Sequence, residues 1–135
     1  IMMLNGALAG LVAITAEPLT PTPGIAIVIG SIGALIMYFG TKMLENFGID
    51  DVVGAIPVHM FAGIFGTLVV PISNSGTSFG TQLIGTLSVC IFSFVLSYIV
   101  FKSLKATVGL RISKAAEKQG TDKSEIGVTA YSIRD

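Results

Sequence analysis

The sequence predicts an all-α integral membrane protein, a polytopic helical bundle with four transmembrane helices. Apolar residues make up 52% of the chain and charged residues only 12%, and the mean hydropathy is +0.83. The charges are also unevenly placed, because residues 18–41 and residues 52–101 contain no Asp, Glu, Lys or Arg. A soluble domain needs charged groups along its whole length to form a polar surface, so this composition excludes one.

Four apolar segments are expected to form the helices, namely residues 1–16, 24–44, 52–73 and 79–101. At 1.5 Å per residue, the last three reach about 30 Å or more, which is enough to cross the hydrocarbon core. The first segment is short and no signal peptide precedes it, so we expect the chain to be the back end of a longer protein. Strictly alternating ten-residue segments are absent from the sequence, which argues against transmembrane strands.

The basic residues predict the orientation in the membrane. Of the eight Lys and Arg residues, Lys42 lies in the second connection and the other seven follow Phe101. The proline-rich connection before Gly24 and the serine-rich connection at residues 73–78 contain none. The positive-inside rule therefore places Lys42 and the tail, residues 102–135, in the cytoplasm and the other two connections outside.

Small residues recur at a spacing of four within three of the segments. The rows are Gly6 and Gly10, then Ala26, Gly30 and Ala34, then Ser93 and Ser97. Such rows let helix backbones approach closely in lipid, where large apolar side chains gain little by touching one another. We interpret them as ordinary bundle packing.

Few residues in this sequence would support catalysis or metal binding. Cys90 is the only cysteine, which excludes an internal disulfide, and its apolar surroundings are typical of a core or lipid-facing residue. No Asp, Glu or Cys lies at ligand spacing from His59 on its helix, and the sequence has no nucleophile–base arrangement or phosphate-binding glycine loop. The formal net charge of zero gives no reason to expect a nucleic acid. We therefore expect no metal, no cofactor and no enzymatic activity.

His59 is the candidate functional residue, because it is the ionisable side chain that lies well inside a predicted span. Ionisable groups are costly within a membrane and usually face a cavity, although a neutral histidine hydrogen-bonded to a neighbouring helix is the structural alternative. Pro57 is expected to release the carbonyl of Val53 and allow a kink near His59. Gly63 and Gly66 follow at helical spacing and form either a close-packing surface or one wall of a narrow path.

Two acids, Asp50 and Asp51, come shortly before this histidine. Carboxylates at the start of a helix favour the helix dipole and cap its exposed amides, and this structural role explains both residues well.

Three separated motifs resemble the ammonium transporter (Amt/Rh) family. Residues 49–59, followed by Gly63 and Gly66, resemble the tenth membrane helix of that family. Residues 5–16 resemble its eighth helix, and residues 107–111 resemble the start of its cytoplasmic tail. The motifs occur in the family's order and together they cover nearly the whole chain.

The resemblance implies an eleven-helix transporter fold, of which this chain carries the last four helices and the tail. It implies a homotrimer in the cell membrane, with one pore per subunit, that takes up ammonium or ammonia as a nitrogen source. His59 matches the second of two histidines whose rings meet in the family's pore. The expected substrate pathway follows His59, Val58, Ile56 and Gly63.

The family's tail docks on cytoplasmic loops and helps to receive a P-II (GlnK-type) regulatory protein. Gly109 and Arg111 match the tail motif, and Asp50 and Asp51 are the expected docking partners of Arg111 on the same face of the membrane.

Two positions depart from the family's usual pattern. Met60 follows His59 where the family usually has glycine, and Ile126 stands where the tail motif often has histidine. Two alternatives to a transporter remain open at this point. One is an ammonium sensor of the same fold that signals through its tail, and the other is a truncated fragment without transport activity of its own.

The predicted orientation can be tested by labelling single cysteines in a Cys90→Ser background. Thr22→Cys should react with a membrane-impermeant maleimide added from outside intact cells, because the first connection carries no basic residue. A Ser124→Cys variant in the tail is the matched control and should react only after the membrane is opened. Labelling of position 22 from the cytoplasmic side alone would contradict the predicted orientation.

Overall fold

The computed structural model describes residues 1–130, and the regular elements within these residues are all helical. Three of the helices are long and apolar enough to cross a membrane, which confirms the predicted fold class. The chain divides into two units, Ile1–Phe92 and Ser93–Asp135.

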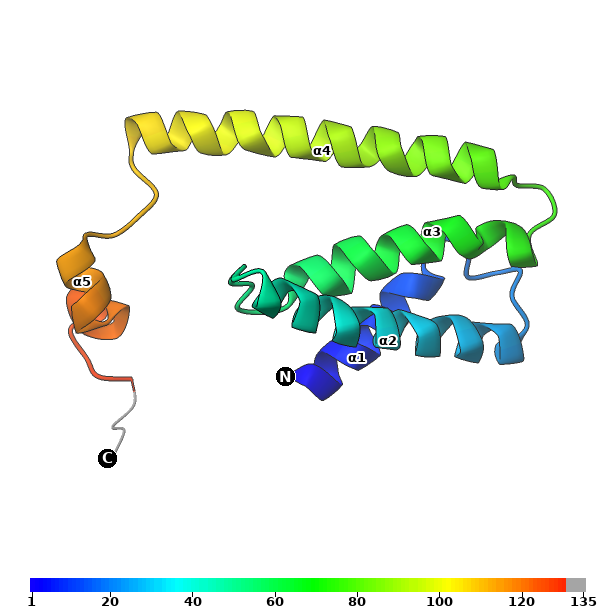
Figure 1. The fold of residues 1–135 in the computed structure, drawn as a ribbon, viewed down its shortest axis with the longest axis horizontal. Helices are drawn as coiled ribbons and strands as arrows, with labels where there is room; N and C mark the ends of the chain where they lie inside the picture. The colour runs from blue at the N-terminus through cyan, green and yellow to red at the C-terminus, as the bar shows by residue number, and fades with distance from the viewer. Residues whose placement is uncertain (131–135) are drawn as a thin grey trace. The chain divides into compact units, whose positions relative to one another are not determined.

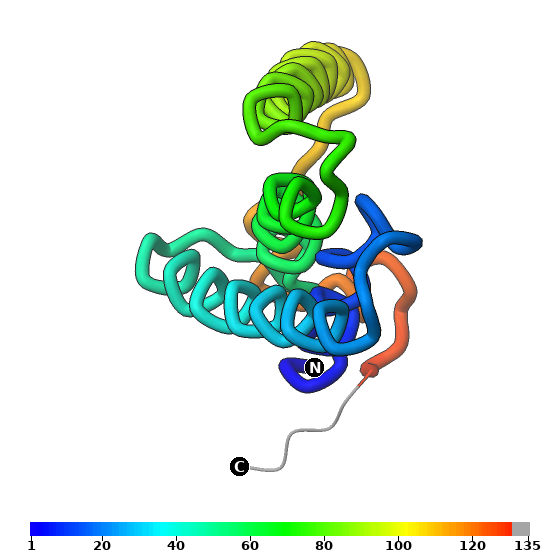
Figure 2. Tube along the Cα trace, turned by 90° about the vertical axis from the view of Figure 1, so that its right-hand side faces the viewer, coloured from blue at the N-terminus to red at the C-terminus, as the bar shows by residue number. Residues whose placement is uncertain are grey.

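The first unit contains a group of three packed helices. These are α1 (Met2–Ile14), α2 (Pro23–Asn46), and a continuous helix made of the π-helical segment η1 (Ile56–Phe61) and α3 (Ala62–Ser73). α1 packs against both α2 and the η1–α3 helix, and the three lie side by side (Figures 1 and 2). A fourth helix, α4 (Phe79–Thr107), begins in this unit and ends in the second.

Helix length separates α1 from the other three. α2, η1–α3 and α4 contain 24, 18 and 29 residues, and at 1.5 Å per residue they are about 36, 27 and 44 Å long. A hydrocarbon core of about 30 Å is therefore within the reach of each, allowing for flanking residues. α1 has 13 residues, which is shorter than a full span.

The helix boundaries agree with the expected segments to within two residues except at two places. The third helix is helical from Ala55 onward rather than from Val52, because Gly54 has a φ of +76° and interrupts the regular backbone. α4 continues beyond Phe101 to Thr107, and the left-handed Gly109, with a φ of +80°, follows its end. The helix therefore ends shortly before Gly109.

The core of the three-helix group is built largely from small residues. Its buried cluster contains Ala9, Met37, Val58 and Ala62, with Val12 packed against it. The small alanine side chains let the helix axes come close, so that many backbone atoms and β-carbons gain dispersion contacts.

The predicted small-residue rows of α1 and α2 face each other. A Cβ built on Gly10 would lie 3.1 Å from the carbonyl oxygen of Gly30, and a Cβ built on Gly6 would lie 3.9 Å from the Cβ of Ala34. These positions confirm the packing interpretation for α1 and α2. Ser93 and Ser97 of α4 are exposed, so their row makes no such contact within the described residues.

Gly66 marks the closest approach of α3 to α1. It is buried, and a Cβ at this position would overlap the backbone of Ala13, including its carbonyl oxygen. Gly63, one turn earlier, is less crowded, since its Cβ would lie 3.7 Å from a methyl group of Val12. Of the two interpretations of this glycine pair, close packing therefore accounts for Gly66.

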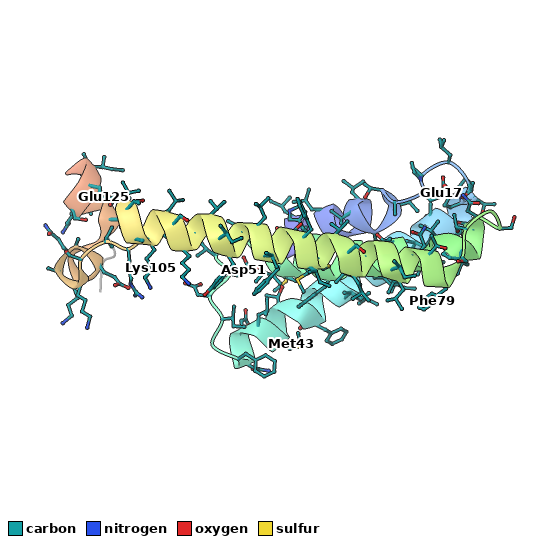
Figure 3. The ribbon with its side chains drawn as sticks, turned by 90° about the horizontal axis from the view of Figure 1, so that it is seen from above. Glu17, Met43, Asp51, Phe79, Lys105 and Glu125 are labelled. Carbon is teal, nitrogen blue, oxygen red and sulfur yellow. The ribbon has the colours of Figure 1, made fainter. Side chains whose placement is uncertain are left out.

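A polar link joins the first and third connections at one end of the unit. The Asn74 Nδ2 donates to Glu17 Oε2 at 2.9 Å. This hydrogen bond, supported by the backbone N–H of Leu19, lowers the pKa of Glu17 below its ordinary value. Glu17 and Asp51 lie toward opposite ends of the first unit (Figure 3), as expected for connections on opposite sides of a membrane.

The second unit continues α4 into the tail. No residue of α4 is buried, and Cys90 in its first half is partly exposed. The tail contains α5 (Lys114–Gln119), whose first turn is capped by the Ser113 hydroxyl, and the short π-helical segment η2 (Asp122–Ile126). The predicted tail extends to Asp135, and its last five residues lie outside the described part of the chain.

Replacing Gly66 by alanine should lower the stability of the purified protein by about 1–3 kcal/mol, the usual cost of overpacking a tight contact. Thermal unfolding in detergent would measure the effect. Gly85→Ala in α4 is the matched control, because it adds the same methyl group to a helix at a position where no described atom outside the backbone of that helix lies within 4 Å. Equal melting temperatures for the two variants would contradict the assigned contact.

Candidate functional site

The candidate site is built where the η1–α3 helix begins. The preceding loop contains two glycines with positive φ, Gly48 at +68° and Gly54 at +76°. Because non-glycine residues rarely adopt this conformation, these glycines allow the chain to leave α2 and turn sharply into the next helix. The loop therefore fixes where the helix that carries His59 starts.

Asp51 closes the first turn of this helix. Its Oδ1 accepts from the backbone N–H of Ala55 at 2.9 Å and its Oδ2 accepts from that of Ile56 at 2.7 Å. The backbone N–H of Gly54 donates to the Asp51 carbonyl at 3.1 Å. The next residue, Pro57, has no N–H, so the donors that a helix start usually leaves unpaired are satisfied here. The predicted capping role is confirmed for Asp51.

Pro57 acts differently from the expectation, because the helix does not extend back to Val53. Proline is well tolerated in the first turn of a helix, where its missing N–H leaves no gap in the hydrogen bonding. Pro57 is fully buried and packs at this turn. The Val53 carbonyl receives no hydrogen bond from Pro57, as expected, but it accepts one from a side chain of another helix.

That donor is Asn5 of α1. Its Nδ2 donates to the Val53 carbonyl oxygen at 2.8 Å across 48 residues of sequence. A Cβ on Gly54 would lie 2.5 Å from the same Nδ2, so the absence of a side chain at position 54 makes room for the amide. Sequence reasoning did not single out Asn5. The sequence feature that could have indicated Asn5 is an amide side chain in an otherwise apolar segment, because such residues often form hydrogen bonds between helices in membranes.

The π-helical segment sets the direction of His59. The backbone N–H of Ala62 donates to the carbonyl of Pro57, five residues earlier, which is the π-helical pattern. It also donates to the carbonyl of His59, three residues earlier. Single π-helical turns of this kind occur frequently at functional sites. Val58 is 2% exposed and lies in the core cluster, whereas the next residue, His59, is exposed.

The expected substrate pathway residues thus do not share one environment. His59 lies on an exposed part of η1. Ile56 and Gly63 are half-buried, and Val58 packs inward. His59 is therefore exposed at the surface of the three-helix group, whereas the preceding Pro57 and Val58 are buried within it.

A small cleft lies beside the loop, with a volume of about 220 Å³. Its lining residues include three acids, Glu45, Asp50 and Asp51. Glu45 forms an ion pair with Lys42 at 2.9 Å, and Asp51 is engaged by the amides of the helix start. Asp50 is exposed.

In the tail, Arg111 is paired locally. Its Nη2 donates to Glu117 Oε1 at 2.8 Å and to Oε2 at 3.1 Å, and this carboxylate raises the pKa of Arg111 above its ordinary value. The pair is well exposed, so it contributes little to stability. The expected docking of Arg111 on Asp50 or Asp51 stays a prediction.

Within residues 1–130, His, Cys, Asp and Glu side chains form no group of three or more that could hold a metal ion. The chemistry available at the site is that of a single imidazole, which in its neutral form offers one hydrogen-bond donor and one acceptor.

Comparison with known proteins identifies the relatives of this chain. Residues 1–131 match the model of the Ammonium Transporter Family. The chain is 36% identical over 150 residues to ammonium transporter Amt2 of Archaeoglobus fulgidus, covering 96% of this chain and 32% of that protein. It is 36% identical over 135 residues to ammonium transporter Amt2 of Methanocaldococcus jannaschii, covering 94% of this chain and 32% of that protein. The chain thus spans about a third of the length of these curated relatives.

Removing the Asp51 carboxylate should expose the start of the η1–α3 helix. Asp51→Ala is expected to destabilise this turn by about 1 kcal/mol, the usual value for a lost helix cap. Hydrogen exchange at the amides of Ala55 and Ile56 should then become faster. Asp50→Ala, which removes the neighbouring carboxylate, should leave both exchange rates unchanged, and equal effects of the two variants would contradict the assignment.

Proposed function

Because the chain belongs to the ammonium transporter family, we propose that it forms the carboxy-terminal part of a protein that carries ammonium or ammonia across the cell membrane. The match to the family model over residues 1–131 is the observation that carries this proposal. The position of His59 adds to it. The residue lies on a helix of membrane-spanning length, and its side chain is directed away from the packing contacts of that helix.

The proposed mechanism follows from the cost of moving a charge through an apolar path. An ammonium ion without water or a counter-charge carries a large desolvation penalty in hydrocarbon, whereas neutral ammonia does not. Deprotonation near the entrance would let ammonia pass, while the proton travels separately. A neutral imidazole can accept a hydrogen bond from ammonia at one nitrogen and donate one at the other, so His59 suits guidance of ammonia or relay of a proton.

His59 would act as one member of a histidine pair in the pore. The residues in this chain form only one side of such a path, with Ile56 and Gly63 next to His59 along the helix and Val58 holding the turn in the core. The other histidine and the opposite wall would come from parts of the protein that correspond to the remaining two thirds of its relatives.

Further features of the family are proposed for the intact protein. They are a homotrimer with one pore per subunit, a role in nitrogen uptake, a cytoplasmic carboxy terminus, and a P-II (GlnK-type) partner at the cytoplasmic face. The one-sided distribution of Lys and Arg supports the orientation. The sensor alternative shares the fold and the ligand, and a signalling domain after Asp135 in the complete gene would favour it over transport.

His59→Ala in the full-length protein should reduce methylammonium uptake or alter the charge moved per substrate, because no other group would then occupy the position of the imidazole. Uptake and currents would be measured at matched membrane expression. Thr67→Val is the matched control on the same helix, since the Thr67 hydroxyl donates within its own helix to the Gly63 carbonyl at 2.9 Å. Unchanged flux and unchanged currents in His59→Ala would refute a pore role for this residue.

A further inference from the structure

We propose that Asn5 is a positioning residue for His59, acting through the loop from which the histidine-bearing helix starts. The inference rests on the proposed role of His59 in transport and extends it to a side chain on a different helix. Asn5, Val53 and Gly54 together form a clasp between α1 and this loop, defined by one hydrogen bond and one close approach.

Two observations define the clasp, and both concern the Asn5 amide nitrogen. The first is the hydrogen bond of 2.8 Å from Asn5 Nδ2 to the Val53 carbonyl. The second is the space at Gly54, where a Cβ would come within 2.5 Å of the same amide nitrogen. Gly54 also has a φ of +76°, a conformation that residues with side chains rarely adopt. The loop is therefore shaped to receive the Asn5 amide against its backbone.

A short chain of backbone bonds leads from the clasp to the histidine. The backbone N–H of Val58 donates to the carbonyl of Gly54 at 3.1 Å, so the residue directly before His59 is bonded to the clasp. Movement of Gly54 would shift this bond and with it the first turn of η1. Because the core fixes Val58 on one side of this turn, the same shift would rotate the direction in which His59 points.

The chemistry of the amide matches what the site requires. A carbonyl oxygen needs a donor, and the Asn5 NH₂ group supplies one without placing a charge in a helix that lies in the membrane. An ionised aspartate at this position would place a carboxylate oxygen, which can only accept, against the Val53 carbonyl oxygen, which also only accepts. A leucine of similar size would fill the space but leave the Val53 carbonyl without this partner.

The test compares Asn5→Leu, Asn5→Asp and Asn5→Gln in the full-length protein. The first two remove the donor, while Gln keeps an amide on a longer side chain. Thr15→Val, near the other end of α1, is the control, because the Thr15 hydroxyl donates to the Val12 carbonyl of its own helix. Methylammonium uptake at matched membrane expression, its concentration dependence, and hydrogen exchange at the Val58 amide would be measured for each.

Asn5→Leu and Asn5→Asp should lower the maximal uptake rate about tenfold, since small displacements of a functional group have large effects on rate. The substrate concentration at half-maximal rate should change little, and the Val58 amide should exchange faster. Asn5→Gln should recover much of the uptake, and Thr15→Val should behave as wild type. An unchanged Val58 exchange rate in Asn5→Leu would overturn the inference, as would a loss of uptake that Asn5→Gln fails to relieve.

The two proposals fail in different ways. If His59→Ala reduces uptake and Asn5→Leu does not, the positioning role is wrong and the pore role of His59 stands. If His59→Ala leaves uptake unchanged, the proposed role of His59 is wrong. A wild-type uptake rate in Asn5→Leu combined with faster Val58 exchange would show that the clasp orders the loop without serving transport, and would overturn the inference as well.

Discussion

A helix start leaves backbone donors without partners, and in this protein one carboxylate satisfies them for the helix on which the site depends. Asp51 accepts from the amides of Ala55 and Ile56, and its carbonyl accepts from Gly54. The fourth position is Pro57, which has no donor to satisfy. Because this capping fixes the residue at which the helix starts, it also fixes the face of the helix on which each later residue lies. The buried residues Val58, Ala62, Gly66 and Val70 then recur every four positions along the face that meets the rest of the bundle.

Close packing, rather than large apolar side chains, holds the three helices together. Apolar side chains in a bilayer gain little by leaving lipid for protein, so stability has to come from dispersion contacts at short distance and from hydrogen bonds. Gly10 against Gly30, and Gly66 against Ala13, remove the side chains that would keep the backbones apart. This arrangement also has a consequence for the site. With Val58 and Ala62 committed to the core, His59 is left on the uncovered side of η1.

Polar links occur at both ends of this group of helices. At one end Asn74 bonds Glu17, and at the other Asn5 bonds the Val53 carbonyl. Each is a hydrogen bond between segments about 50 residues apart in sequence, and a single hydrogen bond of this kind contributes little to stability. Their importance is therefore geometric more than energetic, because each one fixes a connection relative to a helix. In the tail, by contrast, Arg111 is bonded to the nearby Glu117.

The sequence by itself determined the helical membrane class, the approximate spans, the capping by Asp51 and the family, because each of these depends on local composition or on a short motif. Three features depended on the tertiary structure. The helix carrying His59 starts at Ala55 rather than at Val52, Val58 faces the core while His59 does not, and the Val53 carbonyl is bonded by Asn5. Helical periodicity could not predict them, because a left-handed glycine and a π-helical turn both change the rotation per residue that such reasoning assumes. The partner of Val53 could not be predicted either, since Asn5 is 48 residues away and becomes its neighbour only when α1 packs against the loop.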